Sequence, residues 1–265
     1  MRKTVKKIII ILLDIALAVY LVFAMTSFNT PDESGRICTK VAIQIEDKNS
    51  NGFLSSDEIK NILVHNRLYP LNKKITDINP RDIEELLMRS PFIKTAECYK
   101  DQNNHVSINI TQQLPIIRIK NIKGEDYYLD ERGGIMPNTR YVSDLIIATG
   151  SISKWYAKAY LTNMARVIMN NDMWNNLIVQ INILPDLGVE VIPRIGNHAV
   201  YLGSLPQSKN AAEREKLINE FINNKLTRLE KFYKYGLNEA GWNKYSYINL
   251  EFDNQIICKK QNKKK

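Results

Sequence analysis

Residues 90–111 read SPFIKTAECYKDQNNHVSINIT, and this stretch predicts a β-hairpin. Val106, Ile108 and Ile110 alternate with polar residues, which is the period-two pattern of a half-buried strand. The turn-forming residues 101–104, DQNN, join this strand to the preceding segment FIKTAECYK. We therefore expect two neighbouring antiparallel strands with one face packed against other elements.

The residues before the hairpin add one strand and two helices. CTKVAIQI at 38–45 again alternates apolar and polar residues and predicts a strand. Residues 55–58, SSDE, supply helix N-cap residues before an apolar pattern with helical spacing, and Asn79-Pro80 opens a second pattern of the same kind. The order β-α-α-β-β therefore predicts a first domain at 38–112.

The residues after the hairpin predict a second domain at 113–260, which is mostly antiparallel β structure with two helices. The helices are expected at 153–170 and 211–235. Three strands, at 176–183, 188–193 and 198–203, are separated by short turns and predict a meander. The segment YSYINLEFDNQIICKK at 245–260 predicts one closing strand. The fold class is therefore α+β.

An apolar run precedes both domains. Residues 8–25 contain one charge, Asp14, and as a helix they would span ~27 Å, which is close to the hydrocarbon thickness of a bilayer. We expect a membrane helix at 8–27, a linker at 28–37, and a short cytoplasmic tail at 1–7, since the basic residues lie before the run. A cleaved signal peptide is the alternative, although the run exceeds the usual ~7 to 15 residues. Asp14 would either draw water or headgroups inward or contact a polar group on a partner helix.

The net charge of +9 lies at the two ends of the chain. Residues 1–7 hold four basic residues and residues 259–265 hold five, with no acidic residue in either segment. The remaining 251 residues are therefore neutral, which argues against nucleic-acid binding. Residues 261–265 form a Lys-rich tail.

One segment resembles a calcium-binding loop. Residues 47–58, DKNSNGFLSSDE, match the twelve-residue EF-hand pattern with Gly52 at its sixth position. An EF-hand needs a helix before the loop, whereas residues 38–45 predict a strand. We therefore expect a polar turn that ends in a helix N-cap, and no metal site.

The sequence contains no pattern for catalysis or cofactor binding. Its three histidines stand near no nucleophile motif, and no phosphate-binding glycine pattern occurs. Its three cysteines, Cys38, Cys98 and Cys258, include no CxxC pair, and a bridge between Cys38 and Cys258 stays open. We expect no cofactor, no small-molecule substrate and no enzymatic activity.

The order of these parts resembles the FtsQ/DivIB cell-division proteins, whose first exported domain is a POTRA domain. Three local segments carry the resemblance: Ser90 to Ala96 at the entry to the hairpin, Tyr128 to Gly134 around a Gly-Gly turn, and Tyr247 to Phe252 in the closing strand. Asn249 and Glu251 depart from the acidic and basic residues usual in that strand. The resemblance implies a single-pass protein of the inner membrane at the division septum, with the bulk of the chain periplasmic.

The resemblance also implies partners and contact residues. Such proteins bind the single-span proteins FtsB/DivIC and FtsL, partly by strand pairing along the last strand, and the complex regulates septal peptidoglycan synthesis. Carried onto this chain, the expected partner contacts are Tyr247, Leu250, Phe252, Asp253, Asn254 and Ile256, while Asp14 is the expected membrane contact. The alternative is a membrane-anchored extracytoplasmic enzyme acting on envelope polymers, which rests on location alone.

Overall fold

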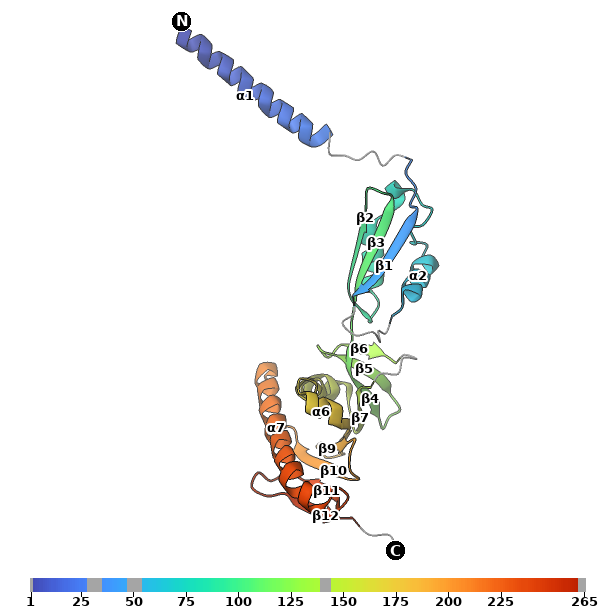
Figure 1. The fold of residues 1–265 in the computed structure, drawn as a ribbon, viewed down its shortest axis with the longest axis vertical. Helices are drawn as coiled ribbons and strands as arrows, with labels where there is room; N and C mark the ends of the chain where they lie inside the picture. Colours follow the sequence, from blue (N-terminus) through green and yellow to red (C-terminus); the bar gives the residue numbers. More distant parts are fainter. Residues whose placement is uncertain (1, 28–34, 47–53, 139–143, 262–265) are drawn as a thin grey trace. The chain divides into compact units, whose positions relative to one another are not determined.

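The computed structural model describes residues 2–27, 35–46, 54–138 and 144–261. The chain divides into two compact units. The N-terminal unit comprises Met1–Glu46, Ser55–Arg89 and Thr95–Thr111, and the C-terminal unit comprises Asp47–Leu54, Ser90–Lys94 and Gln112–Lys265. Each unit is described by itself, and Figure 1 identifies their elements.

The apolar run forms part of one long helix, α1 (Arg2–Ser27). Large apolar side chains are exposed along it, from Ile9 to Met25. Within the described residues, however, no helix combines the length and the apolarity needed to cross a membrane. The span expected at residues 8–27 is thus not found among the described residues.

The predicted β-α-α-β-β order is confirmed. The elements are β1 (Lys40–Glu46), α2 (Ser56–His65), the 3-10 turn η1 (Ile75–Asp77), α3 (Pro80–Met88), β2 (Ile93–Lys100) and β3 (His105–Gln112). The strands form a three-stranded sheet in the order β1-β3-β2, with β1 parallel to β3.

Helix caps fix where the two helices of this unit begin. Ser55 and Glu58 form a reciprocal capping box at α2, and the Asn79 side chain caps α3 with Pro80 at its first position. The apolar faces of the helices and of β3 are buried together, and the buried residues include Ile59, Leu63, Ile83, Leu87, Val106, Ile108 and Ile110.

The C-terminal unit is built on a nine-stranded sheet. Its strands are β4 (Pro115–Asn121), β5 (Asp126–Asp130), β6 (Ile135–Pro137), β7 (Ile146–Gly150), β8 (Ile178–Ile183), β9 (Gly188–Pro193), β10 (Ala199–Ser204), β11 (Tyr245–Asn249) and β12 (Ile257–Lys260). Their spatial order is β12-β11-β10-β9-β8-β7-β4-β5-β6. The pairs β4–β7, β7–β8 and β10–β11 are parallel and the other five are antiparallel, so the sheet is mixed. The predicted meander is present as β8, β9 and β10.

Two helical segments cover this sheet (Figure 1). The first contains α4 (Lys154–Tyr156), the π-helical turn η2 (Ala157–Leu161), α5 (Thr162–Met169) and α6 (Asp172–Leu177). The second contains α7 (Ala211–Phe232), the π-helical turn η3 (Tyr233–Leu237) and α8 (Asn238–Ala240). Their apolar side chains join those of the strands in one core, for example Ile168, Ile222 and Leu229 with Val191 and Ile248.

The two edges of the nine-stranded sheet differ. At one edge, the Asp130 amide donates to the Gly134 carbonyl (3.0 Å), so alternation along β6 turns the nitrogen of Pro137 toward the open side. This edge strand therefore lacks an outward donor at Pro137, while the same alternation turns the Ile135 amide outward. The other edge is β12.

The prediction of one closing strand at 245–260 is wrong, because this segment forms two strands, β11 and β12. The chain runs along β10 as β11, leaves the sheet after Asn249, and returns as β12, which pairs antiparallel with β11. The alternation of buried and half-exposed residues continues only to Leu250. After that residue, the backbone bonds to helix α7 instead of to a strand.

Candidate functional site

The outer side of β12 is an open strand edge. The Gln261 amide donates to the Lys244 carbonyl (3.0 Å), so alternation points the amides of Cys258 and Lys260 away from β11. Strand β12 is four residues long and ends in Lys259-Lys260. Short length and lysine side chains are features that protect an edge strand from unselective pairing. Strand β12 therefore presents a backbone ladder that a suitable strand can extend.

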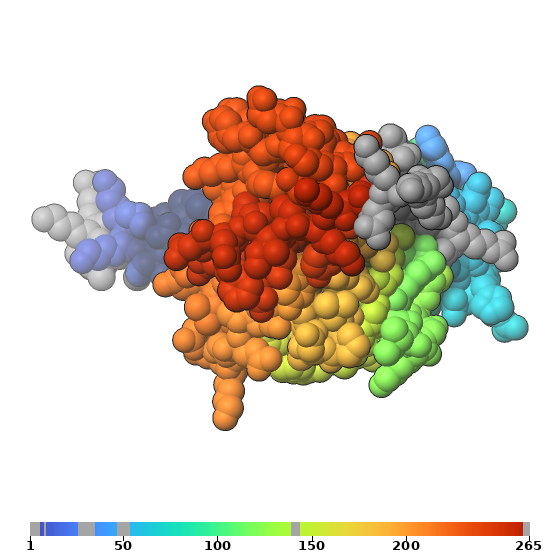
Figure 2. All heavy atoms as spheres, turned by 90° about the horizontal axis from the view of Figure 1, so that it is seen from below, coloured from blue at the N-terminus to red at the C-terminus, as the bar shows by residue number. Residues whose placement is uncertain are grey.

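The loop at 250–256 lies between β11 and β12 and is tied to α7 by two cations. Lys225 Nζ donates to the carbonyl oxygens of Leu250 (2.8 Å) and Glu251 (2.8 Å). The guanidinium of Arg228 donates to the carbonyl oxygens of Leu250, Phe252 and Gln255, at 3.2, 2.7 and 3.1 Å. Figure 2 shows these C-terminal residues, in red, at the surface beside α7.

A groove of about 470 Å³ runs between the end of α7 and the start of β12. Its walls are Arg228, Lys231, Phe232, Tyr235, Gly236 and Ile256. Tyr235 is largely exposed, and the Phe232 ring packs at 6.3 Å from the ring of Tyr245 in β11. The groove is thus lined by apolar and aromatic side chains together with two basic ones, and Ile256 in its wall immediately precedes β12.

Two protein-family models match the chain. Residues 36–111 match a POTRA-like domain. Residues 114–259, more than half of the chain, match the model described as FtsQ/DivIB, C-terminal related. This chain belongs to the FtsQ/DivIB family. The resemblance seen in the sequence is therefore confirmed, and it gives the chain a role in bacterial cell division. No curated protein matches it.

Leu250 was among the predicted partner contacts of this FtsQ/DivIB chain, and the structure corrects that prediction. Its side chain is 0% exposed and belongs to the core of the C-terminal unit. Leu250 lies two residues after Ile248, and both belong to the core that also contains Ile222 and Leu229 of α7. Leu250 therefore supports the site without being accessible to a partner.

The other predicted contacts lie around the loop. Phe252 is 47% exposed, and the Asp253 side chain is 87% exposed while its carboxylate accepts from Lys225 Nζ (3.1 Å). Asn254 is exposed, and Ile256 is half-buried against the core. Tyr247 lies apart from them on β11, where its hydroxyl donates to the Glu190 carboxylate (3.0 Å). Asp14, the predicted membrane contact, is exposed on α1.

The sequence analysis did not identify the residues of α7 and η3 that belong to this site. Lys225 and Arg228 bond to the loop, and Phe232 and Tyr235 line the groove with Ile256. All four lie 15 to 25 residues before the loop begins. Of these four residues, Lys225 is the one that the sequence could have revealed, because it interrupts the apolar face of α7 between Ile222 and Leu229.

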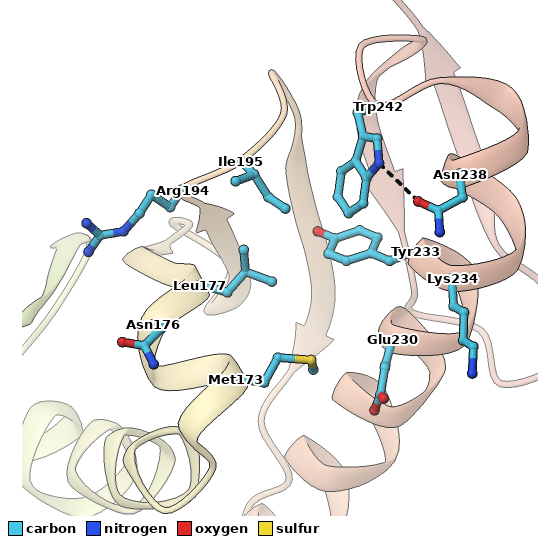
Figure 3. Close-up of a pocket in the computed structure, with 10 residues that line it drawn as sticks. All are labelled: Met173, Asn176, Leu177, Arg194, Ile195, Glu230, Tyr233, Lys234, Asn238 and Trp242. Carbon is cyan, nitrogen blue, oxygen red and sulfur yellow. Dashed lines mark hydrogen bonds between the residues drawn. The ribbon is translucent and has the colours of Figure 1, made fainter.

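A second hollow, of about 520 Å³, lies between α6, the β9–β10 turn and η3. Met173, Leu177, Ile195, Tyr233 and Trp242 face one another around it (Figure 3). Two of its polar wall groups are already bonded: the Trp242 indole donates to Asn238 (3.2 Å), and the Tyr233 hydroxyl lies 2.9 Å from His198 Nε2. Burial lowers the pKa of His198 and raises the pKa of Tyr233, so this hydrogen-bonded pair is held uncharged.

The described residues offer no metal centre. No group of three or more His, Cys, Asp or Glu side chains gathers within them. Residues 47–53 of the calcium-like loop lie outside the described residues, but the element that precedes them is the strand β1, as predicted. Glu58, the last residue of that loop pattern, accepts from the Ser55 amide (2.9 Å) as part of the α2 capping box. Cys38, Cys98 and Cys258 are free thiols.

Proposed function

We propose that this FtsQ/DivIB-family chain is a non-enzymatic scaffold of the cell-division complex. It recruits FtsB/DivIC-like and FtsL-like single-span proteins and thereby links them to septal peptidoglycan synthesis. The observation that carries this proposal is the open edge of β12 beside an exposed loop and an apolar groove. An added strand gains main-chain hydrogen bonds from the edge, while pockets for alternate side chains give specificity.

The charges around the edge indicate what the partner strand carries. Lys259 and Lys260 lie on β12, and Arg228 and Lys231 line the groove. A partner with acidic residues complements this surface, and an apolar side chain fills the groove. Docking of this kind needs no reacting group, which is consistent with a scaffold.

We also propose that residues 8–27 anchor the chain in the inner membrane with residues 28–265 exported. The support is the 18-residue apolar run with one charge, preceded by four basic residues. The exposed apolar side chains of α1 need a nonaqueous environment, which a bilayer provides.

Protease added to spheroplasts is expected to digest nearly the whole chain and to leave an N-terminal fragment of ~3 kDa. Immunoblotting with tags at each end measures this directly, and intact cells serve as the unexposed control. Protection of the bulk of the chain in spheroplasts contradicts the proposed orientation.

Replacing Phe252 with alanine is expected to weaken binding of the FtsB/DivIC-like protein from the same genome by about fivefold to tenfold. The ring is 47% exposed in the free chain, and burying the rest of it contributes about 1 kcal/mol. Calorimetry with the purified full-length chain in mild detergent measures the affinity. Ile122→Ala is the matched control, because Ile122 is also an exposed apolar residue but lies in the β4–β5 turn. Equal affinities for all three proteins would remove Phe252 from the interface.

A further inference from the structure

A lysine occupies a core position of the longest helix in the C-terminal unit. Lys225 is 4% exposed and is flanked on the same face of α7 by Ile222, Leu226 and Leu229. Burial of a cation is costly unless hydrogen bonds compensate it, and an apolar side chain of similar volume is often at least as stabilising at such a position. Stability alone therefore does not explain Lys225.

The bonds of Lys225 account for its burial. The ammonium group has three donors, and it has three acceptors: the carbonyl oxygens of Leu250 and Glu251, both at 2.8 Å, and the Asp253 carboxylate at 3.1 Å. All three acceptors belong to the loop at 250–256. Helix α7 thus holds the loop through a single buried side chain.

These bonds lie where the chain leaves the sheet. The Leu250 amide still donates to the Tyr201 carbonyl of β10 (2.8 Å), which is the last bond of the chain to that strand. The next carbonyl groups point to Lys225 and Arg228 instead of to a neighbouring strand. Because they are bonded to α7, the backbone turns at Leu250 and returns as β12 at the edge of the sheet.

We infer that Lys225, assisted by Arg228, is the positioning residue that holds β12 as a docking edge. Lys225 itself is buried and touches no partner; it fixes the loop, and the loop sets where β12 begins along β11. This inference rests on the proposed function for its effect on binding, but its effect on the edge is measurable without any partner.

The test compares Lys225→Met with the wild-type full-length chain by hydrogen–deuterium exchange and by binding. Methionine keeps the buried volume and removes the three bonds. We expect exchange in the peptide 250–261 to accelerate at least tenfold, exchange in β8 and β9 to stay unchanged, and affinity for the FtsB/DivIC-like protein to fall at least tenfold. Lys216→Met is the matched control, since Lys216 is an exposed lysine of the same helix, and it is expected to change neither.

Each outcome decides the inference. Wild-type exchange in residues 250–261 of Lys225→Met overturns it, whatever the binding result. Accelerated exchange with unchanged affinity also overturns it, because the edge would then not need to be held. Should the wild-type chain fail to bind, the proposed function fails, and exchange alone reports whether Lys225 holds β12. If Lys225→Met does not fold, Arg228→Gln replaces it, because Arg228 bonds to the same loop from a more exposed position. The same two measurements are then made.

Discussion

Replacing Lys260 with proline is expected to weaken binding of the FtsB/DivIC-like protein at least a hundredfold while leaving the melting temperature nearly unchanged. The Lys260 amide points away from β11, so proline removes a donor only from the open side. The ring also occupies the space into which the partner backbone must come. In a helix interior, where proline both removes a backbone bond and clashes, the cost is on the order of 3 kcal/mol, and a similar cost at this edge corresponds to this loss of affinity.

Two neighbouring variants isolate the backbone contribution. Lys260→Ala removes the same charge but keeps the N–H group, and should lose much less affinity. Lys259→Pro removes a donor that faces β11, and should instead loosen the hairpin and lower the melting temperature. If Lys260→Pro binds as tightly as Lys260→Ala, the partner does not pair with β12, and docking on this edge is wrong.

Replacing Leu250 with alanine is expected to lower the free energy of unfolding of the C-terminal unit by ~3 kcal/mol. The side chain is fully buried, and truncation of a buried leucine loses apolar burial and leaves a cavity. For a unit of this size, the melting temperature should fall by about 10 °C. Circular dichroism during heating measures it.

Phe252→Ala is the matched comparison for this variant, because the two residues are two positions apart and both are large and apolar. The exposed Phe252 should leave the melting temperature within about 2 °C. A melting temperature of Leu250→Ala equal to that of the wild type would show that Leu250 is not packed in the core, and would return it to the set of partner contacts.

The sequence was most informative where local chemistry decides the structure. The capping residues Ser55 and Asn79 mark the two helix starts, and the alternation of Val106, Ile108 and Ile110 marks a strand, since each of these signals acts within a few residues. In the closing segment, the same alternation groups Ile248, Leu250 and Phe252 on one face; the first two are buried, whereas Phe252 is exposed.

The break after Leu250 was not predictable in this way. The residues that end β11 are on α7, and nothing in residues 245–260 reveals that the Glu251 and Phe252 carbonyls have cationic donors. The pattern of the closing segment is compatible with a continuous strand, and tertiary hydrogen bonds override it. For the same reason, a groove with walls from α7 and from Ile256 could not be inferred from either segment alone.

The unlike edges of the nine-stranded sheet bear on the stoichiometry of assembly. At the β6 edge, which is three residues long, the nitrogen of Pro137 faces outward without a hydrogen, so that strand offers an incoming chain a short ladder with one donor missing. Of the two edges, β12 is the more favourable for strand addition, and a strand that pairs there supplies an edge of its own sequence. The C-terminal unit is therefore expected to take up one partner strand at β12 and none at β6. Such a unit ends a series of added strands and does not continue it as a subunit of a fibre would. The mass of the purified complex reports this ratio.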